Sequence, residues 1–398
     1  SESAMYASTF LHNRFLKSFP SIHQVRLKCV VDAVDSVLHC QHLQLTAIGR
    51  GLNNNVADKH SIKRIDRLLG NRQLNVERFD FYKWVATQTL ITKKHPVILV
   101  DYSDVNPLQT HFIIRAAVSV HGRALTVYEE VHEQLNNPIL LRGFVKALSL
   151  LLPKNCRPII VTDAGFRGTW RDMITERGWF YVMRQRNNEL AHFPGEKWHP
   201  CKDLYHLARR APRCLGEIVI NRNSPCHTQA YVYAEPSKKR IARTLKGKKK
   251  RSSHSKKHAA REREPWLLLS NLPLTYNSAD RVVKLYKQRM QIEELFRDLK
   301  SHRTGLRFRG TQCRQRIRLE ALLLLAALAN FIVWIMGLWS INRRLHHGMQ
   351  ANTIRHRNVL SVITVGFRLI AQKIIMSSSE FWRSKELLQN EIQNVAVF

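Results

Sequence analysis

Three acidic residues are the candidates for chemistry. The apolar run at residues 97–100 ends at Asp101, and the run at residues 158–162 ends at Asp163. Carboxylates at strand ends lie at the edge where an open sheet meets its ligands. A third carboxylate, Glu293, lies far downstream in a segment of helical period. Three such anions in one site need cations between them, and hard oxygen ligands favour Mg²⁺ or Mn²⁺. Two ions about 3.5–4 Å apart can support phosphoryl transfer at phosphodiesters.

The segment that carries Glu293, residues 278–301, is predicted to be one amphipathic helix. Its apolar stripe contains Leu285, Ile292, Phe296 and Leu299, and its polar stripe contains Tyr286, Arg289, Glu293, Arg297 and Lys300. Ser278 is placed to cap the helix. In the polar stripe, Tyr286, Arg289 and Lys300 flank the acid and are candidates to hold phosphates. A solvated, salt-bridged surface helix is the alternative, and Asp104 competes with Asp101 for the metal role.

The overall charge indicates a polyanionic partner. The chain has 398 residues, with 64 Lys and Arg against 30 Asp and Glu, so the net charge is 64 − 30 = +34. This excess is spread over the whole length, which favours nucleic acid as the partner. The seven cysteines form no C-x-x-C pair, which favours a reducing compartment over a zinc site or a disulfide framework. The first residues do not resemble a secretion signal.

One apolar segment has nearly the length of a membrane span. Residues 321–339 are almost entirely apolar but include Asn330. Arginines lie on both sides of it, so there is no positive-inside asymmetry. We expect a helix that is buried against a sheet, and no membrane partner.

The N-terminal region is predicted to be helical up to about Ile91. Residues 45–50 read as a helix with a tight turn after it, and a second helical segment opens at Ser61. That segment has an apolar back and a basic front formed by Lys63, Arg64 and Arg67, as a helix in the major groove would need. The alternative is an ordinary amphipathic surface helix.

From Pro96 onward the pattern predicts strand, strand, strand, helix, strand, helix, which indicates a mixed sheet covered by helices.

Residues 238–263 contain thirteen Lys and Arg against the single Glu262, and they predict a basic loop. A nuclear-import signal is the alternative for this loop. Residues 352–373 form a basic amphipathic segment, and the helical tail from Ser379 is expected to pack on the core or on a second subunit.

The chain resembles the bacterial cut-and-paste insertion-sequence transposases of the DDE type that carry a Tyr-Arg-Glu-Lys signature (insertion-sequence family four). Tyr286, Arg289, Glu293 and Lys300 match the signature at every spacing, and residues 100–104 and 161–166 look like the contexts of its two aspartates. The similarity runs from about Leu45 to Leu360.

The resemblance implies an α/β fold with a ribonuclease-H-like, mixed-sheet catalytic core that is interrupted by a mostly β insertion. It places an N-terminal helical DNA-binding region at 1–91, the core at 92–186 and 266–372, the insertion with its basic loop at 187–265, and a C-terminal helical tail at 373–398. Asp101, Asp163 and Glu293 would be the catalytic metal ligands for Mg²⁺ or Mn²⁺, two ions in each site.

The resemblance also implies partners and reaction steps. The partner would be double-stranded DNA: a homodimer in a synaptic complex would hold two transposon ends and join them to target DNA, on the nucleoid in the bacterial cytoplasm. The steps are end nicking, hairpin formation, hairpin resolution and strand transfer, with no nucleotide cofactor. Trp266 would take the place of a base flipped out during hairpin formation, or else be a core tryptophan on a strand. Two alternatives remain: an inactive DNA-binding regulator derived from a transposase, and a nuclease with the same core but without strand transfer.

Overall fold

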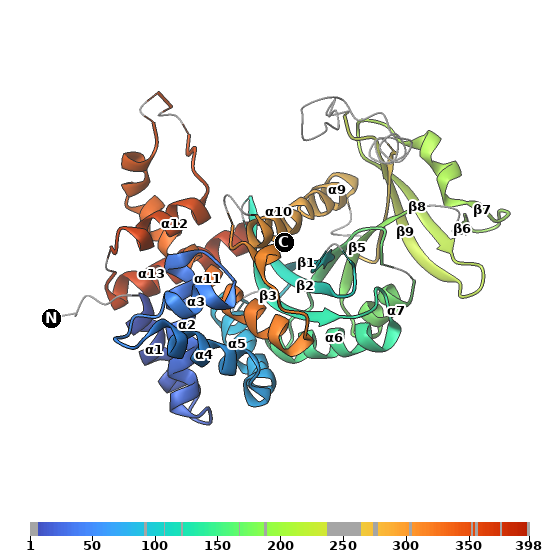
Figure 1. The fold of residues 1–398 in the computed structure, drawn as a ribbon. Coiled ribbons are helices and arrows are strands. Elements are labelled where there is room, and N and C mark those ends of the chain that lie inside the picture. The colour runs from blue at the N-terminus through green and yellow to red at the C-terminus, as the bar shows by residue number, and fades with distance from the viewer. Residues whose placement is uncertain are drawn as a thin grey trace, which may run out of the picture. The chain divides into compact units, whose positions relative to one another are not determined.

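The computed structural model describes residues 7–90, 94–106, 108–120, 122–166, 168–186, 189–236, 264–273, 278–301, 305–351, 353–354, 357–374 and 376–395. These residues form two compact units. The first unit is built from residues up to 156 and from residue 290 onward, and the second is built from residues 157–289. Figure 1 gives the order of the elements along the chain. The basic loop predicted at residues 238–263 lies outside the described residues.

The described part of the first unit begins with five helices, which agrees with the helical character predicted up to about Ile91. They are α1 (Ala7–Ser18), α2 (Gln24–Cys40), α3 (Leu45–Arg50), α4 (Asp58–Leu69) and α5 (Arg72–Leu90). One predicted boundary is wrong, because α4 begins at Asp58 and not at Ser61. Ser61 is instead buried inside the helix, and its hydroxyl donates to Oδ1 of Asn54 at 3.1 Å. The hydroxyl of Ser61 thus finds its hydrogen-bond partner in the turn before α4. Serine often marks the start of a helix, but this one lies inside it.

The strands of the first unit are β1 (Val97–Asp104), β2 (Phe112–Val120) and β3 (Arg123–His132). They pair antiparallel, with β2 between the other two. The predicted hairpin of β2 and β3 is confirmed, and Gly122 in its turn has φ +77°, a conformation that favours glycine. Helix α6 (Pro138–Leu151) follows, capped by the side chain of Asn137.

The remaining helices of the first unit are α10 (Met290–Lys300), α11 (Arg316–Asn342), α12 (Val362–Ala371) and α13 (Ser378–Val395). Helix α11 is long and apolar enough to cross a membrane, yet 94% of its most apolar stretch is buried inside the protein. It packs against β3 and against α2, α5, α12 and α13. The expectation of a buried helix is thus confirmed, and α13 packs on the core of its own unit.

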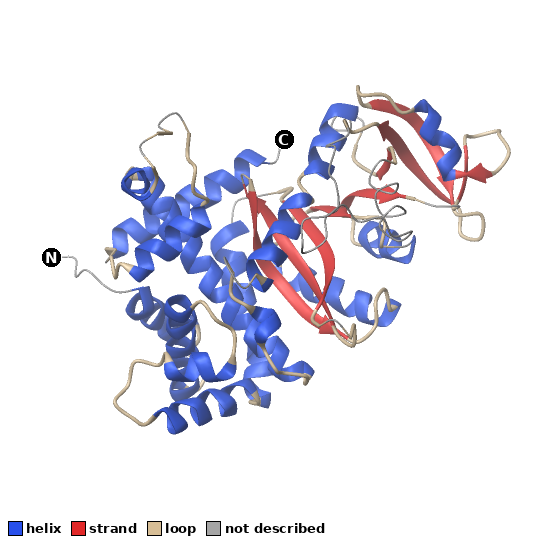
Figure 2. Cartoon of the chain, turned by 45° about the horizontal axis from the view of Figure 1, so that its top comes forward, coloured by secondary structure: helices blue, strands red, loops and turns tan. Residues whose placement is uncertain are grey.

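The second unit is rich in strands (Figure 2). It contains β4 (Ile159–Thr162), α7 (Gly168–Glu176), β5 (Phe180–Gln185), β6 (Leu190–His192), β7 (His199–Pro200), β8 (Arg213–Ile220), β9 (Cys226–Tyr233), β10 (Trp266–Ser270) and α9 (Ala279–Lys287). The strand order is β4-β5-β10-β9-β8-β6-β7, with β4 parallel to β5 and β10 antiparallel to both β5 and β9. The fold is therefore a mixed α/β one, as predicted.

A buried ion pair joins β2 to β3 in the first unit. Arg115 and Glu129 face each other across the two strands, and Nη2 of Arg115 lies 2.6 Å from Oε2 of Glu129. Both side chains are almost fully buried. Tyr82 also donates to Glu129, at 3.3 Å, so the carboxylate is shared within the core.

We predict that Glu129→Gln lowers the free energy of unfolding by about 3–5 kcal/mol, because it leaves the Arg115 charge buried without its counter-ion. Urea unfolding of the full chain measures this. Glu217→Gln is the control, since it removes a carboxylate that pairs with His227 at an exposed position and should cost at most about 1 kcal/mol. Equal losses in the two variants would contradict a core role for the buried pair.

Candidate active site

The first unit carries two of the three proposed carboxylates. Asp101 lies on β1, opposite Arg115 of β2, and its Oδ1 accepts a hydrogen bond from the backbone N–H of Tyr102 at 2.8 Å. Glu293 lies in the first turn of α10, a helix that packs against β1 and β3. Both acidic residues are half-buried. The elements that carry Asp101 and Glu293 are therefore in contact within this unit.

Asp101 is not at the end of its strand, so that prediction was wrong. The ladder of β1 with β2 continues through the pairs Ser103–Ile113 and Asp104–Phe112. The side chains of β1 become more exposed after Val100, although the backbone of the strand remains paired with β2. Loss of hydrophobicity marks where a strand leaves the core, whereas its end is set by the hydrogen bonds of its neighbour. The residue at the strand end is the exposed Asp104.

The single helix predicted for residues 278–301 is also wrong. Helix α9 ends at Lys287 and α10 begins at Met290. Between them, the N–H groups of Gln288 and Arg289 bond to carbonyls three residues back, which tightens the last turn and closes the helix. The chain passes from the second unit to the first at this break. Tyr286 and Glu293 thus lie on different helices, although the predicted apolar stripe is buried and Ser278 does cap α9.

Lys300, at the end of α10, reaches β1. Its ammonium donates to Oγ of Ser103 at 2.6 Å and to the backbone carbonyl of Asp104. Burial is the main cause that lowers the pKa of Lys300 to about 8, and repulsion from Arg309 adds to it. The attraction of Asp104 acts in the opposite direction and raises this pKa. The first unit therefore places a buried cation beside the strand of Asp101.

The second unit carries Asp163 in the connection between β4 and α7. As predicted, β4 is a short buried strand that ends directly before this residue. Oδ1 of Asp163 accepts the N–H of Gly165 at 2.7 Å, so the side chain closes its own turn. The carboxylate is half-buried. The local geometry thus presents Asp163 at the carboxyl end of a parallel strand.

Tyr286 and Trp266 form an aromatic cluster in the same unit. The rings of Trp266 and Tyr286 pack edge to face with centroids 4.8 Å apart, and the ring of Tyr233 lies 5.4 Å from Trp266. Burial raises the pKa of Tyr286, Arg289 and Arg184 oppose that shift, and Asp163 adds to it. Trp266 is buried on β10, which agrees with the alternative of a core tryptophan on a strand.

Sequence reasoning missed Arg184, which the structure adds to this cluster. Arg184 is buried at the end of β5, and its guanidinium carbon lies 5.9 Å from the centre of the Trp266 ring. Burial lowers its pKa, and the nearby Tyr286 opposes the shift. An arginine within an otherwise apolar strand is the signal that could have revealed it.

The predicted basic face of α4 lines a groove. Lys63 and Arg67 are exposed, while Arg64 is half-buried and holds Asp32 of α2 at 2.6 Å. The groove has a volume of about 550 Å³ and is also lined by Arg26, His23 and His60. Helix α3 packs very closely on α4, because a methyl group on Gly49 would lie 2.6 Å from the Cα of Ile62. The three predicted basic residues thus lie on one surface, backed by a tight pair of helices.

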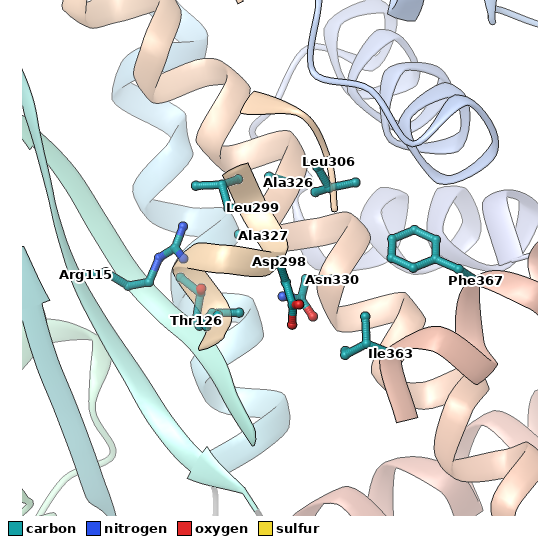
Figure 3. Close-up of a pocket in the computed structure, with 11 residues that line it drawn as sticks. Arg115, Thr126, Asp298, Leu299, Leu306, Ala326, Ala327, Asn330, Ile363 and Phe367 are labelled. Carbon is teal, nitrogen blue, oxygen red and sulfur yellow. The ribbon is translucent and has the colours of Figure 1, made fainter. Parts of the chain in front are cut away.

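A small cavity of about 30 Å³ lies in the first unit between α10, α11 and α12 (Figure 3). It is mostly apolar and is also lined by Asp298 and Asn330. A cavity of this volume holds at most a few water molecules. This cavity is therefore too small to be a substrate site.

The three proposed metal ligands are divided between the units, with Asp101 and Glu293 in the first and Asp163 in the second. Within the described part of either unit, no three His, Cys, Asp or Glu side chains form a group that could hold a metal ion. Neither unit thus supplies a complete metal site from its own described residues.

Comparison with known protein families identifies part of the chain. The family model described as the transposase DDE domain matches residues 131–331. The matched region begins after Asp101 and includes Asp163, Trp266, Tyr286 and Glu293. No curated protein matches the chain.

Proposed function

The chain belongs to the transposase DDE domain family, and on that premise we propose that it is a cut-and-paste DNA transposase that uses Asp101, Asp163 and Glu293 as its catalytic carboxylates. The observation that carries this proposal is the family match over half of the chain, which includes two of the three acids. The family acts on DNA and in general uses divalent metal ions. The excess of basic residues supports a DNA partner.

The donor set fits Mg²⁺ or Mn²⁺. All three proposed ligands are carboxylates, and they carry hard oxygen atoms of the kind these ions prefer. The two aspartates are half-buried, and backbone N–H groups orient one oxygen of each. When bound, a pair of such ions supplies an activated attacking oxygen and a stabilised leaving oxygen.

The proposed reaction consists of four exchanges at phosphorus. Water first displaces the 3′-oxygen at the transposon end, and the freed 3′-hydroxyl then attacks the opposite strand and forms a hairpin. A second water opens the hairpin, and the 3′-hydroxyl finally attacks target DNA. Each step makes one P–O bond and breaks another, so no nucleotide cofactor is needed.

The basic residues near the carboxylates would position the DNA. We assign Lys300 to a phosphate near Asp101, because its buried ammonium is already held beside β1. Tyr286 and Arg289 would serve the same purpose near Asp163. The charges of Asp163 and Arg184 both act on the hydroxyl of Tyr286, and the guanidinium of Arg289 lies beside the Tyr286 ring. Lys63, Arg64 and Arg67 would bind the transposon ends, and a homodimer would hold two ends together.

Trp266 is proposed to occupy the place of a flipped base. Flipping costs a few kcal/mol, and stacking on an aromatic ring contributes about 1–3 kcal/mol per base. The ring already lies in an aromatic cluster with Tyr233 and Tyr286, so a base could stack there only after this cluster rearranges.

We predict that Trp266→Ala slows hairpin formation about 5- to 150-fold, the equivalent of about 1–3 kcal/mol, and slows the first nick much less. Single-turnover assays on labelled ends separate the two steps. Trp266→Phe should restore part of the rate because it keeps a stacking face. Trp198→Ala is the control, a half-buried tryptophan of the same unit. Equal loss at both steps would mean that Trp266 only supports the core.

The decisive experiment incubates the protein with linear DNA that ends in the element's inverted repeats, with and without Mg²⁺. Hairpin products followed by joined products are the expected result. Cleavage without joining would support the nuclease alternative, and binding without cleavage would support the regulator. Short inverted repeats on both sides of the gene would supply the substrate sequence for this test.

A further inference from the structure

A chain of hydrogen bonds in the first unit leads to the residue beside Asp101. The hydroxyl of Tyr102 lies 2.9 Å from Nδ1 of His132, and Nε2 of His132 lies 3.1 Å from Oε2 of Glu130. His132 is fully buried, and Tyr102 and Glu130 are half-buried. Tyr102 belongs to β1 and the other two residues belong to β3. We call these three residues the Tyr102 tether.

The tether lies on the face of the sheet opposite to Asp101. Successive side chains of a strand point to opposite faces, and Asp101 and Tyr102 are neighbours on β1. Tyr102 pairs with Ile114 of β2, which in turn pairs with Glu130 of β3, so these three residues share a face. Asp101 pairs instead with Arg115. The tether thus joins β1 to β3 across the intervening β2 (Figure 1).

The groups at the two ends of the tether set the direction of its hydrogen bonds. Tyr128 donates to the second carboxylate oxygen of Glu130. Burial acts to raise the pKa of Glu130, but the bonds from His132 and Tyr128 outweigh it and lower this pKa, so the carboxylate is ionised and accepts from Nε2 of His132. Burial raises the pKa of Tyr102, and a backbone hydrogen bond from Asn136 opposes that shift. Tyr102 therefore keeps its proton and donates it to Nδ1 of His132.

Tyr102 holds Asp101 at the same time. The backbone N–H of Tyr102 donates to Oδ1 of Asp101 at 2.8 Å. After Val100 the side chains of β1 are no longer fully buried, so packing fixes this part of the strand less firmly than the buried run before it. Because the tether anchors the Tyr102 side chain, it also fixes the peptide group that orients the carboxylate.

We propose that Tyr102, anchored through His132 to Glu130, is a positioning residue that holds the Asp101 carboxylate in the orientation for a divalent ion. The inference rests on the proposed function, in which Asp101 is a metal ligand. Carboxylates that bind metals are themselves hydrogen-bonded, and loss of such an outer partner typically costs about 10–100-fold in metal affinity or activity. The tether would therefore act on the metal through Asp101 and would not touch it.

The test is Tyr102→Phe, which removes the hydroxyl and keeps the ring and the backbone N–H. We expect the Kd for Mn²⁺ to rise about tenfold. Electron paramagnetic resonance of free Mn²⁺ measures this Kd on the full chain in complex with a linear duplex. Asp101→Asn identifies the Mn²⁺ to be counted, because it removes the ligand itself. The measurement requires binding of the ion and no cleavage.

Two sets of variants separate positioning from a general loss of stability. Tyr181→Phe removes another buried hydroxyl, which donates to Oγ1 of Thr228 at 2.8 Å, and it should bind Mn²⁺ like the wild type. His132→Gln keeps an acceptor and a donor, so it should bind Mn²⁺ more tightly than His132→Ala. In the Tyr102→Phe background, His132→Ala should add little, because both substitutions break the same connection. Circular dichroism confirms that each variant is folded.

Equal Mn²⁺ affinities for Tyr102→Phe and the wild type, with the ion lost in Asp101→Asn, would overturn the inference and leave the proposed function in place. A loss in Tyr181→Phe as large as that in Tyr102→Phe would also overturn it, because any buried hydroxyl would then have this effect. If Asp101→Asn binds as much Mn²⁺ as the wild type, the proposed function loses a metal ligand and the inference falls with it. The Asp101→Asn variant thus distinguishes the two failures.

Discussion

Glu293→Gln is expected to abolish Mg²⁺-dependent cleavage of transposon ends while DNA binding stays near the wild-type level. The substitution keeps the shape of the side chain and removes the negative charge, so a divalent ion loses one anionic ligand. Loss of one preorganised electrostatic contact to a transition state costs about 10²–10³-fold in rate, and loss of a metal should cost at least as much. Single-turnover nicking of a labelled duplex measures the rate, and anisotropy measures binding.

The neighbouring Glu294 provides a matched control on the same helix. Its carboxylate pairs with Arg123 at 3.4 Å and with Arg297 at 2.6 Å, both within the first unit. Glu294→Gln makes the same change of charge one residue away and should keep cleavage. Asp101→Asn and Asp104→Asn form a second pair, of which only the first should lose activity. Retained nicking by Glu293→Gln would refute the catalytic role of Glu293. Loss of nicking in Asp104→Asn but not in Asp101→Asn would refute the catalytic role of Asp101.

The affinity for DNA should depend steeply on salt. A protein that contacts some 6–10 phosphates loses about 10³–10⁵-fold in affinity between roughly 50 and 200 mM salt, because counterions are released from each phosphate. The net charge of +34 makes contacts of this number reasonable. A titration of a labelled duplex at several salt concentrations measures the slope. A flat response would show that the basic excess does not act on DNA.

Substitutions in the groove locate part of this effect. Lys63→Gln with Arg67→Gln removes two exposed charges of α4 and should lower the salt slope by about two. Arg142→Gln with Lys146→Gln removes two exposed charges from α6 and serves as the control. A larger loss in the α6 variant would move the DNA-binding surface away from the groove.

Many local features could be predicted because they depend on neighbours in the chain. The run of apolar residues before Asp163 predicted β4, and alternation around Gly122 predicted the hairpin of β2 and β3. The apolar length of α11 predicted a helix, and the strands upstream of it favoured burial over a membrane. Ser278 predicted the start of α9. In each case, hydrophobic period or capping chemistry acts within a few residues.

Other features depend on partners that are distant in sequence. The segment from Ser278 to Ser301 has no glycine or proline, so no local signal marks the break at Gln288 and Arg289. The break lies where the chain leaves strands β5, β9 and β10 and begins to pack on β1 and β3. Likewise, β1 extends to Asp104 because β2 pairs with it, whatever the polarity of its last residues.

Residue types, spacing and charge were enough to identify the acidic candidates, the basic face of α4 and the class of partner. Tertiary structure alone decided that Arg184 joins Trp266 and Tyr286 and that Lys300 is buried against β1. The reason is physical. Period and composition report how a residue meets its neighbours along the chain, whereas burial of a charge and the direction of a hydrogen bond are set by side chains that folding brings from elsewhere.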